Sequence, residues 1–592
     1  MPRPTQTYRV GSFLGLTDDL GVEARPNQAS ILKNLYRLRD KLIVRGGTAP
    51  LGDANLYPNT QIDGLSWFRL SSVDVLFGAH NGRVVDFLHS VYPHEVTNSS
   101  GKLTALRNVP FAVVDGKAYA SDGLLPMIRL TSLRADRAMP TTPSAPTLAD
   151  GGAGALPAAT YSYRIVWLSA DVTNESVPSA VAQIVLGASR QVTVTRPILP
   201  AGQDISGWRI YRLPAGSTLY RVVTTISDTT TASYTDNNLD AAIAANAALS
   251  TADRTAFPPC QLLIEHEGRL MGARCSAAEG DMFTLYISNY REPWYSPVLP
   301  DLTDPNAGTR ISIPGAWAGE ITGIVSHGDR VLVFTGGSVN VLIGDQPLEY
   351  SLKLLAPHGC VAHRTIQKLH DRLFWASSDG VFMAASGQPV RHISDDLATA
   401  YRAISPPDKA KMHAFIHDNK YFLCWPTGAW WYDVRYEIWG EHSNWLWRTT
   451  APSIYQGTTN PRIFAAQEGA ARVWELETGV TDNGVAIETD FASRDEDFGL
   501  PGREKRLHYL GAVFKAGSGT VTARLYRGTG ELIQTISYNL ATLPVPGATI
   551  SRMDERVSEA ARDEFFKARL THSDSVGGYE ILSLDGRHSL AT

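Results

Sequence analysis

The stretch QKLHDRLFWASSDGVFM, residues 367–383, contains the pattern that is most informative about the fold: a β-run, a short polar turn and a second β-run. The unit recurs as AVVDGKAYA at 112–120, LLIEHEGRLMGA at 262–273, IVSHGDRVLVF at 324–334, AFIHDNKYFLCW at 414–425 and FAAQEGAARVWEL at 464–476, with an early copy, VLFGAHNGRVVDF, at 75–87. Repetition of a supersecondary unit predicts a repeat fold.

Each copy predicts a β-hairpin. Asn81-Gly82, Asp115-Gly116, Glu267-Gly268 and Asp418-Asn419 are residue pairs that can supply the positive φ of tight hairpin turns. The flanking runs are rich in β-branched and aromatic residues, as half-buried strands are.

The turns fall at positions 81, 115, 267, 328, 371, 418 and 468, which gives gaps of 34, 152, 61, 43, 47 and 50 residues. Four of the six gaps lie near the roughly 40–50 residues of one four-stranded propeller blade. The spacing therefore predicts an all-β fold built on a β-propeller.

The gap of 152 residues has its own explanation. A proline-rich linker, PTTPSAP at 140–146, precedes TYSYRIVWLSA at 160–170 and further short strands, a pattern typical of a small antiparallel sandwich. The stretch resembles a fibronectin type III domain, with Trp167 and Trp208 as its expected core residues. Removing 115 residues, 141–255, from the gap of 152 leaves 37. The sandwich is therefore predicted to be an insertion into the propeller.

The expected organisation has five parts. An N-terminal arm with one short helix in ASILKNLYRLRDK is predicted over 1–50, and the first part of the propeller over 51–139. The inserted domain is predicted over 140–256, the second part of the propeller over 257–480, and a separate C-terminal β-domain over 481–592.

Composition narrows the class of protein. A formal charge of −5 over 592 residues argues against a dedicated non-specific DNA binder, whose surface would be basic. Four cysteines without paired spacing favour reduced, buried thiols. The chain shows neither an apolar run long enough for a membrane span nor a signal peptide, so we expect synthesis in the cytoplasm.

No motif in the chain predicts catalysis. There is no phosphate-binding GxxxxGK[ST], HExxH or GxSxG motif, and we expect neither an enzyme nor a cofactor. His358, Cys360 and His363 are the best metal candidates, but on a strand the first two face one side and the third faces the other. A turn with a buried thiol is favoured, and no metal site is predicted.

A tryptophan-rich stretch over 425–447 supports two interpretations. It could form a stacking platform for carbohydrate or bases, or it could pack within a blade and between subunits. Packing is favoured, and loops 290–308 and 434–447 are expected to carry contacts with other subunits. The predicted interface residues are Trp294, Tyr295, Trp430, Trp431, Trp439, Trp445 and Trp447.

The order of these parts resembles a known family. Asn34-Leu35-Tyr36-Arg37 and Arg45-Gly46-Gly47 match an N-terminal N-[LIV]-x-R…RGG pattern. A propeller with RLFWASSDGVF and PTGAWWYDVRYEIWGEHS follows, and a β-domain closes the chain. The chain resembles the tail nozzle proteins of short-tailed bacteriophages, also called tail tubular protein B, and the related propeller-bearing tail hubs.

The resemblance implies a structural virion protein without catalytic residues. Expected partners are other copies of the chain in a ring of six, a tail adaptor or portal-proximal ring protein, and tail fibres or spikes. Viral double-stranded DNA would pass through the lumen, and the ring would meet the host envelope at infection. The expected location is the virion tail, assembled in the host bacterial cytoplasm.

Two alternatives stay open at this stage. One is a propeller glycoside hydrolase acting on cell-surface glycan, although no credible pair of carboxylates supports it. The other is a glycan-binding adhesin that uses Trp430 and Trp431.

Overall fold

The computed structural model is all-β, with 56% of residues in strands and 4% in helices. It describes residues 6–590 except 11–12, 19–26, 52–60, 71–72, 89–93, 170–173, 188, 251–253, 276–280, 298–302, 314–318, 444, 446, 453–461, 468–471, 516–518, 541–549, 559–560 and 575–578. The chain divides into two compact units, residues 1–67 with 358–592 and residues 68–357.

The fold is a β-propeller, because its described strands repeat a four-stranded antiparallel sheet along the chain. In the unit of residues 68–357, four blades follow one another. Their strands are β6 (Ile62–Leu70, which begins in the other unit), β7 (Val73–His80), β8 (Arg83–Asp86) and β9 (His94–Glu95); β10 (Phe111–Val114), β11 (Lys117–Ala120), β12 (Ile128–Leu130) and β13 (Ala135–Arg137); β22 (Cys260–His266), β23 (Arg269–Cys275), β24 (Thr284–Ile287) and β26 (Thr309–Ser312); and β27 (Ile321–His327), β28 (Arg330–Thr335), β29 (Val339–Ile343) and β30 (Ser351–Ala356).

The other unit contains three more blades. They are formed by β31 (Gln367–Leu369), β32 (Arg372–Ala376), β33 (Val381–Ala385) and β34 (Arg391–His392); by β35 (His413–His417), β36 (Lys420–Trp425), β37 (Gly428–Asp433) and β38 (Ile438–His442); and by β39 (Trp447–Pro452), β40 (Ile463–Gln467) and β41 (Val473–Leu476). The fourth strand of the last blade comes from the start of the chain. It is β5 (Thr48–Pro50), which pairs with β41 in antiparallel register.

The predicted hairpin turns are confirmed. Asn81, Asp115, Glu267 and Asp418 all adopt positive φ, between 42° and 49°. The turn expected at 468 lies outside the described residues, although its flanking strands, β40 and β41, pair as predicted.

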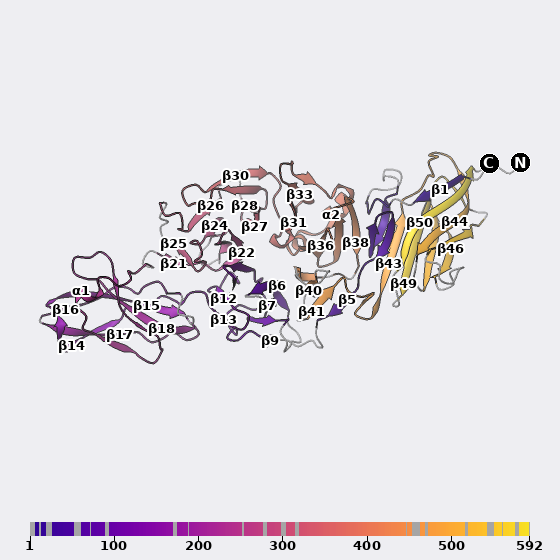
Figure 1. Cartoon of the computed structure of the whole chain (residues 1–592). Coiled ribbons are helices and arrows are strands. Elements are labelled where there is room, and N and C mark those ends of the chain that lie inside the picture. Colours follow the sequence, from indigo (N-terminus) through magenta and orange to yellow (C-terminus); the bar gives the residue numbers. More distant parts are fainter. Residues whose placement is uncertain are drawn as a thin grey trace. The chain divides into compact units, whose positions relative to one another are not determined.

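In chain order a two-sheet unit follows the second blade and precedes the third, and its strands β14 to β18 are labelled in Figure 1. One sheet has the order β14-β17-β20 and the other has the order β16-β15-β18-β19. The strands are β14 (Thr147–Leu156), β15 (Ala159–Ser169), β16 (Ala182–Leu186), β17 (Arg190–Thr195), β18 (Ile205–Arg212), β19 (Arg221–Ile226) and β20 (Ser233–Asp236), followed by α1 (Asp240–Ile243). Trp167 and Trp208 are core residues of this unit, as predicted. Its likeness to fibronectin type III stays a prediction.

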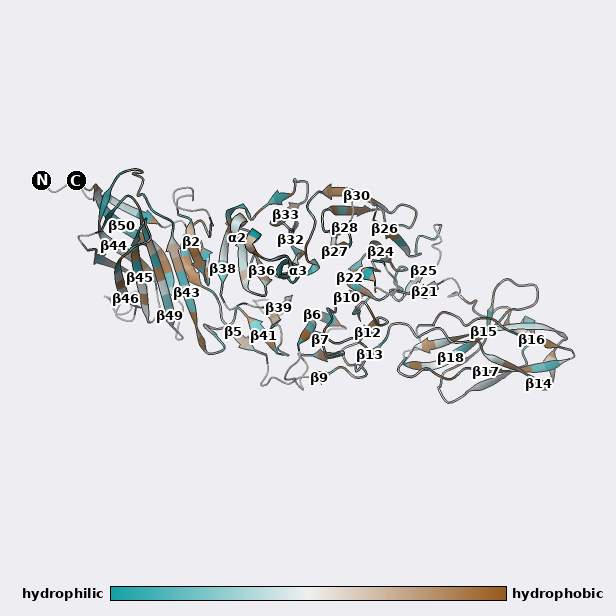
Figure 2. Cartoon of the chain, turned by 180° about the vertical axis from the view of Figure 1, so that it is seen from behind, coloured by the Kyte–Doolittle hydropathy of each residue, from teal (hydrophilic) through white to brown (hydrophobic). Residues whose placement is uncertain are grey.

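The terminal β-domain combines strands from both ends of the chain. One sheet has the order β3-β4-β50-β44-β47, with β1 and β48 attached; in the other, β2, β43, β49, β45 and β46 pair in succession. The strands are β1 (Gln6–Val10), β2 (Ala29–Lys33), β3 (Leu35–Leu38), β4 (Lys41–Val44), β42 (Thr481–Asp482), β43 (Val485–Ser493), β44 (Lys505–Lys515), β45 (Thr520–Arg527), β46 (Leu532–Asn539), β47 (Ile550–Arg556), β48 (Arg562–Asp563), β49 (Phe566–Asp574) and β50 (Glu580–Leu590). Hydrophobic stretches mark β45 and β49 in Figure 2.

The predicted helix in the N-terminal arm is wrong, because ASILKNLYRLRDK forms two strands, β2 and β3. Asn34 separates them with φ 58°, a left-handed conformation that interrupts a right-handed helix. The backbone of β2 pairs with β38 and β43, so tertiary pairing overrides the local helical spacing. The segment is therefore an integral part of the terminal domain rather than an arm.

Candidate functional site

A connected set of polar residues surrounds the segment 29–50. This segment lies beside β38 of the sixth blade, crosses the terminal domain and ends as the outer strand of the seventh blade. Five buried or mostly buried residues hold it there, and we call them the clamp: Asn34, Tyr36, Arg45, Glu477 and Asp482.

Asn34 uses its amide to join two parts of the fold. Its Nδ2 donates to Ser443 Oγ and to the Glu488 carbonyl oxygen, both at 2.6 Å. Its Oδ1 accepts from the Ser443 backbone N–H at 3.1 Å and from Arg45 Nε at 3.0 Å. The backbone at Asn34 is left-handed, with φ 58°, a conformation that asparagine tolerates better than most residues.

Arg45 supplies the charge of the clamp. Its Nη1 and Nη2 donate to Asp482 Oδ1 and Oδ2 at 2.9 and 2.5 Å, and Nη1 also donates to the Gly46 carbonyl oxygen at 2.8 Å. Parallel bonds of this kind are the strongest arginine–carboxylate arrangement. The arginine side chain is 0% exposed, and its guanidinium lies 4.9 Å from the ring centre of Trp445.

Tyr36 and Glu477 form the second half of the clamp. The Tyr36 hydroxyl donates to Glu477 Oε1, and the Gly46 backbone N–H donates to Glu477 Oε2 at 2.9 Å. Burial raises the pKa of Glu477, and burial together with the neighbouring Glu477 carboxylate raises the pKa of Tyr36 well above its usual value. The tyrosine therefore keeps its proton and remains a donor.

His442 lies against the same group, with its ring 5.3 Å from that of Tyr36 and 4.1 Å from that of Trp445. Burial, with Arg45 and Lys420 nearby, holds the pKa of His442 well below its usual value. The ring is therefore neutral at physiological pH, and it does not add a cation to the clamp.

The glycine pair in the RGG motif has a steric cause. A Cβ on Gly47 would lie 2.0 Å from the carbonyl oxygen of Thr481, and one on Gly46 would lie 2.6 Å from the carbonyl carbon of Glu477. Both obstacles are backbone atoms, which cannot rotate away. The glycines thus allow the strand leading to β5 to approach the turn after β41.

The structure places most of the residues predicted for the interface in the interior of the chain, and their role in subunit contacts stays a prediction. Six of its seven residues are between 0% and 6% exposed and so belong to the core: Tyr295, Trp430, Trp431, Trp439, Trp445 and Trp447. Trp294 is partly buried against a core cluster to which the second and third blades both contribute. Successive residues of β37 are buried, so neighbouring elements cover both of its faces.

Sequence reasoning identified Asn34, Tyr36 and Arg45 only as parts of a family pattern, and it missed their acidic partners. Glu477 and Asp482 lie in the turn-rich stretch ETGVTDNG, which resembles a solvated loop. The one available signal was an arginine followed by two glycines between apolar runs, which is compatible with a close backbone approach.

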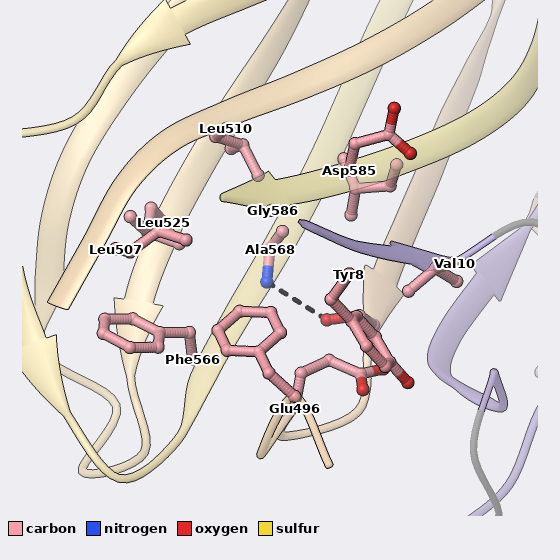
Figure 3. A pocket seen from close by; sticks show the side chains of 13 residues that line it. Tyr8, Val10, Glu496, Leu507, Leu510, Leu525, Phe566, Ala568, Asp585 and Gly586 are labelled. Atoms are coloured by element: carbon pink, nitrogen blue, oxygen red, sulfur yellow. Dashed lines mark hydrogen bonds between the residues drawn. The ribbon is translucent and has the colours of Figure 1, made fainter. Parts of the chain in front are cut away.

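A small pocket with an open mouth lies between the sheets of the terminal domain (Figure 3). Tyr8 and Val10 from β1 line it together with Phe566 and Leu525. The backbone N–H of Ala568 donates to Ser493 Oγ at 3.1 Å, the dashed line in the figure.

The acidic groups of this cavity are paired with arginines. Asp585 accepts from Arg9 Nε at 3.0 Å, and Glu496 lies 3.6 Å from Arg494 Nε. Burial raises the pKa of Glu496, and burial beside this carboxylate raises the pKa of Tyr8 to about 12. The cavity is an apolar space with neutralised acids, and its groups do not form a nucleophile–base pair.

The residues considered as metal ligands are not brought together. His358 stacks on Phe382 with ring centres 4.4 Å apart, while the Cys360 thiol donates to the Ala362 carbonyl oxygen at 3.1 Å. Burial raises the pKa of Cys360 to about 11 and lowers that of His363 to about 4. Within the described ranges, no group of three metal-ligating side chains is found.

None of the helices in the described part of the chain combines the length and the apolar character needed to cross a membrane.

No family model matches the chain, and no curated protein sequence matches it. Among solved structures it is similar to YCF48 from Cyanidioschyzon merolae, with 8% identity, a TM-score of 0.27 and coverage of 73% of this chain and 98% of that one. The AfRom2 CNH domain gives 7% identity, a TM-score of 0.30 and the same coverages. The extracellular domain of the hybrid two-component system BT4673 from B. thetaiotaomicron gives 10% identity, a TM-score of 0.26 and coverage of 93% and 81%. At these scores the similarities carry no inference about function.

Proposed function

We propose that the chain is a structural subunit of a short-tailed phage tail: a nozzle protein that forms a ring around a DNA-ejection channel. The observation that carries the proposal is the clamp. Asn34 and Arg45, which occupy specified positions of the pattern that carries the resemblance, and Tyr36, which lies between them, connect two blades and the terminal domain through part-buried hydrogen bonds. A continuous sheet of 14 strands passes through the same region. Such a connection suits a subunit that transmits force during ejection.

The charge of the chain is compatible with a conduit. Each phosphate neutralised by lysine or arginine adds salt-dependent affinity, so a channel that must release DNA should not be strongly basic. A formal charge of −5 meets this condition. A ring also needs head-to-tail contacts that close. The segments 290–308 and 434–447 remain our candidates for these contacts. Within the second segment 438–442 form the mostly buried strand β38, and 298–302, 444 and 446 lie outside the described residues.

The partners of this proposed ring are those of a tail nozzle. They are an adaptor or portal-proximal ring above it, fibres or spikes attached to it, and double-stranded DNA within it.

Light scattering after size exclusion, combined with negative-stain images of the full-length protein, tests the proposal. We expect closed rings, six-fold by the family resemblance, and the same protein in purified virions by peptide mass spectrometry. The variant Arg391→Met, which alters only an exposed ion pair, should assemble like the wild type. A protein that stays monomeric at all concentrations and is absent from virions would overturn the proposal.

The alternative of a glycan-binding adhesin depended on tryptophan rings that are exposed for stacking. Trp430 and Trp431 are 6% and 0% exposed, so their rings are not available to stack on a sugar. A glycan-array screen of the folded protein would detect binding through another surface.

A further inference from the structure

Two cysteines form a close pair at the end of the first hairpin after the inserted domain. Cys260 is the first residue of β22, Cys275 is the last residue of β23, and the two are directly opposite in the antiparallel register. Their sulfur atoms are 3.1 Å apart, and both residues are 0% exposed. Both are free thiols in the structure.

The backbone already satisfies the requirements of a disulfide. Directly opposite residues in an antiparallel pair have Cα atoms about 4.5–5.5 Å apart, which lies within the range that disulfides span. Closing the pair from its present separation needs the sulfurs to move together by about 1 Å. Side-chain rotation supplies a shift of this size without moving the strands.

We propose that Cys260 and Cys275 are a modification site, where a peroxide oxidant converts the thiol pair into a disulfide that fastens β22 to β23. One thiol gives up its proton, its thiolate attacks a peroxide oxygen, and the O–O bond breaks to leave a sulfenic acid and a hydroxide, which takes up the released proton to become water. The second thiol attacks the sulfenic sulfur, the S–O bond breaks, and a second water leaves as the S–S bond forms. The two thiols lose two electrons in total, and hydrogen peroxide gains them.

The position of the pair favours access despite its burial. Strand ends open locally more easily than strand centres, and the pair occupies the open end of its hairpin. The bond would secure the point where the chain re-enters the propeller after the insertion. This inference rests on the pair geometry and does not depend on the proposed function.

The other two cysteines serve as internal controls. Cys360 and Cys424 are also buried, and burial raises the pKa of both thiols. The thiol of Cys360 forms hydrogen bonds with the Ala362 carbonyl oxygen and the Thr365 hydroxyl. We expect both to remain reduced under conditions that oxidise the pair.

Peptide mapping of the full-length protein tests the proposal. Native protein is treated with graded hydrogen peroxide, quenched with catalase, denatured, alkylated and digested with trypsin. Cys260 and Cys275 fall in separate tryptic peptides, 255–269 and 275–291, so a disulfide yields one cross-linked species lighter by two hydrogens. We expect loss of two of the four alkylatable thiols, reversal by dithiothreitol, and slower hydrogen exchange in 260–275 after oxidation.

The variant Cys275→Ser should lose the cross-linked species and leave a Cys260 that oxidises further to sulfinic acid. If this variant does not fold, the wild-type map alone decides. Persistence of all four thiols, cross-links to Cys360 or Cys424, or separate sulfinic acids without a cross-link would each overturn the proposal.

Discussion

Replacing Arg45 by methionine should loosen the clamp while keeping most of the volume of the side chain. The variant loses the two parallel bonds to Asp482 and the bond from Nε to Asn34. It leaves the Asp482 carboxylate without its cation. Removing one partner of a buried ion pair costs about 3–5 kcal/mol.

The structure narrows the expected cost of the Arg45→Met substitution within this range. The Arg45 side chain is 0% exposed, but that of Asp482 is 23% exposed, so water compensates part of the lost interaction. We therefore expect the free energy of local opening to fall by about 3 kcal/mol, the lower end of that range. Such a change corresponds to a roughly hundredfold larger opening equilibrium constant.

Hydrogen exchange measured by mass spectrometry is the appropriate assay, because a chain with several domains need not unfold in one step. The informative amides are those that join β5 to its neighbours: Gly47 N–H bonded to Gly479 at 3.2 Å, and Leu51 N–H bonded to Val473 at 2.9 Å. Exchange of these peptides should accelerate by about two orders of magnitude, or up to the limit set by global unfolding.

Two variants control this experiment. Arg391→Met removes an ion pair to Glu437 whose side chains are 50% and 49% exposed, and it should cost about 0.5 kcal/mol or less. Arg45→Lys keeps the charge but loses the fork geometry, so it should restore protection only in part. If Arg45→Met accelerates exchange no more than Arg391→Met does, the clamp does not hold the N-terminal segment.

Three further predictions concern other parts of the molecule. Burial lowers the pKa of His413 to about 3, so the histidine takes up a proton at higher pH in the unfolded state than in the folded state. The free energy of unfolding should therefore drop by roughly 1.4 kcal/mol per pH unit as the pH falls from about 6.5 to 3. Denaturant titrations of His413→Phe should show a weaker dependence of the free energy of unfolding on pH. Gly47→Ala should destabilise by about 3 kcal/mol or more because its Cβ meets backbone, whereas Gly336→Ala, with open space around its Cβ, should leave the melting temperature nearly unchanged. Trp431→Ala should cost about 3–5 kcal/mol through the cavity it leaves, and an unchanged unfolding midpoint would contradict its place in the core.

The sequence predicted the hairpins well because their determinants are local. Positive φ at Asn81, Asp115, Glu267 and Asp418 depends on the turn residues and their immediate flanks.

The short first gap of 34 residues also has a structural cause. The first repeat matches the second hairpin of its blade, β7–β8, while the next matches the first hairpin of its blade, β10–β11.

The clamp could not be predicted because its partners are far apart in sequence. Arg45 and Asp482 are separated by 437 positions, and a single sequence contains no signal for their pairing. The same limitation explains the error over 29–38. Ile31, Leu35 and Leu38 have spacing that a helix also permits, and pairing of β2 with β43 decides the outcome. Burial of the tryptophans likewise depends on which neighbouring elements cover each face.

The outer strand of the seventh blade sets the order of folding during synthesis. Residues 48–50 leave the ribosome early, yet the strand with which they pair, residues 473–476, is made more than 400 residues later. A contact of such high sequence separation forms late and slowly. Until then residues 48–50 lack the strand with which they pair, and incomplete chains expose unpaired backbone. Translation that stops before residue 473 would therefore yield a chain that cannot complete the propeller, and such chains would be the ones most open to proteases and aggregation.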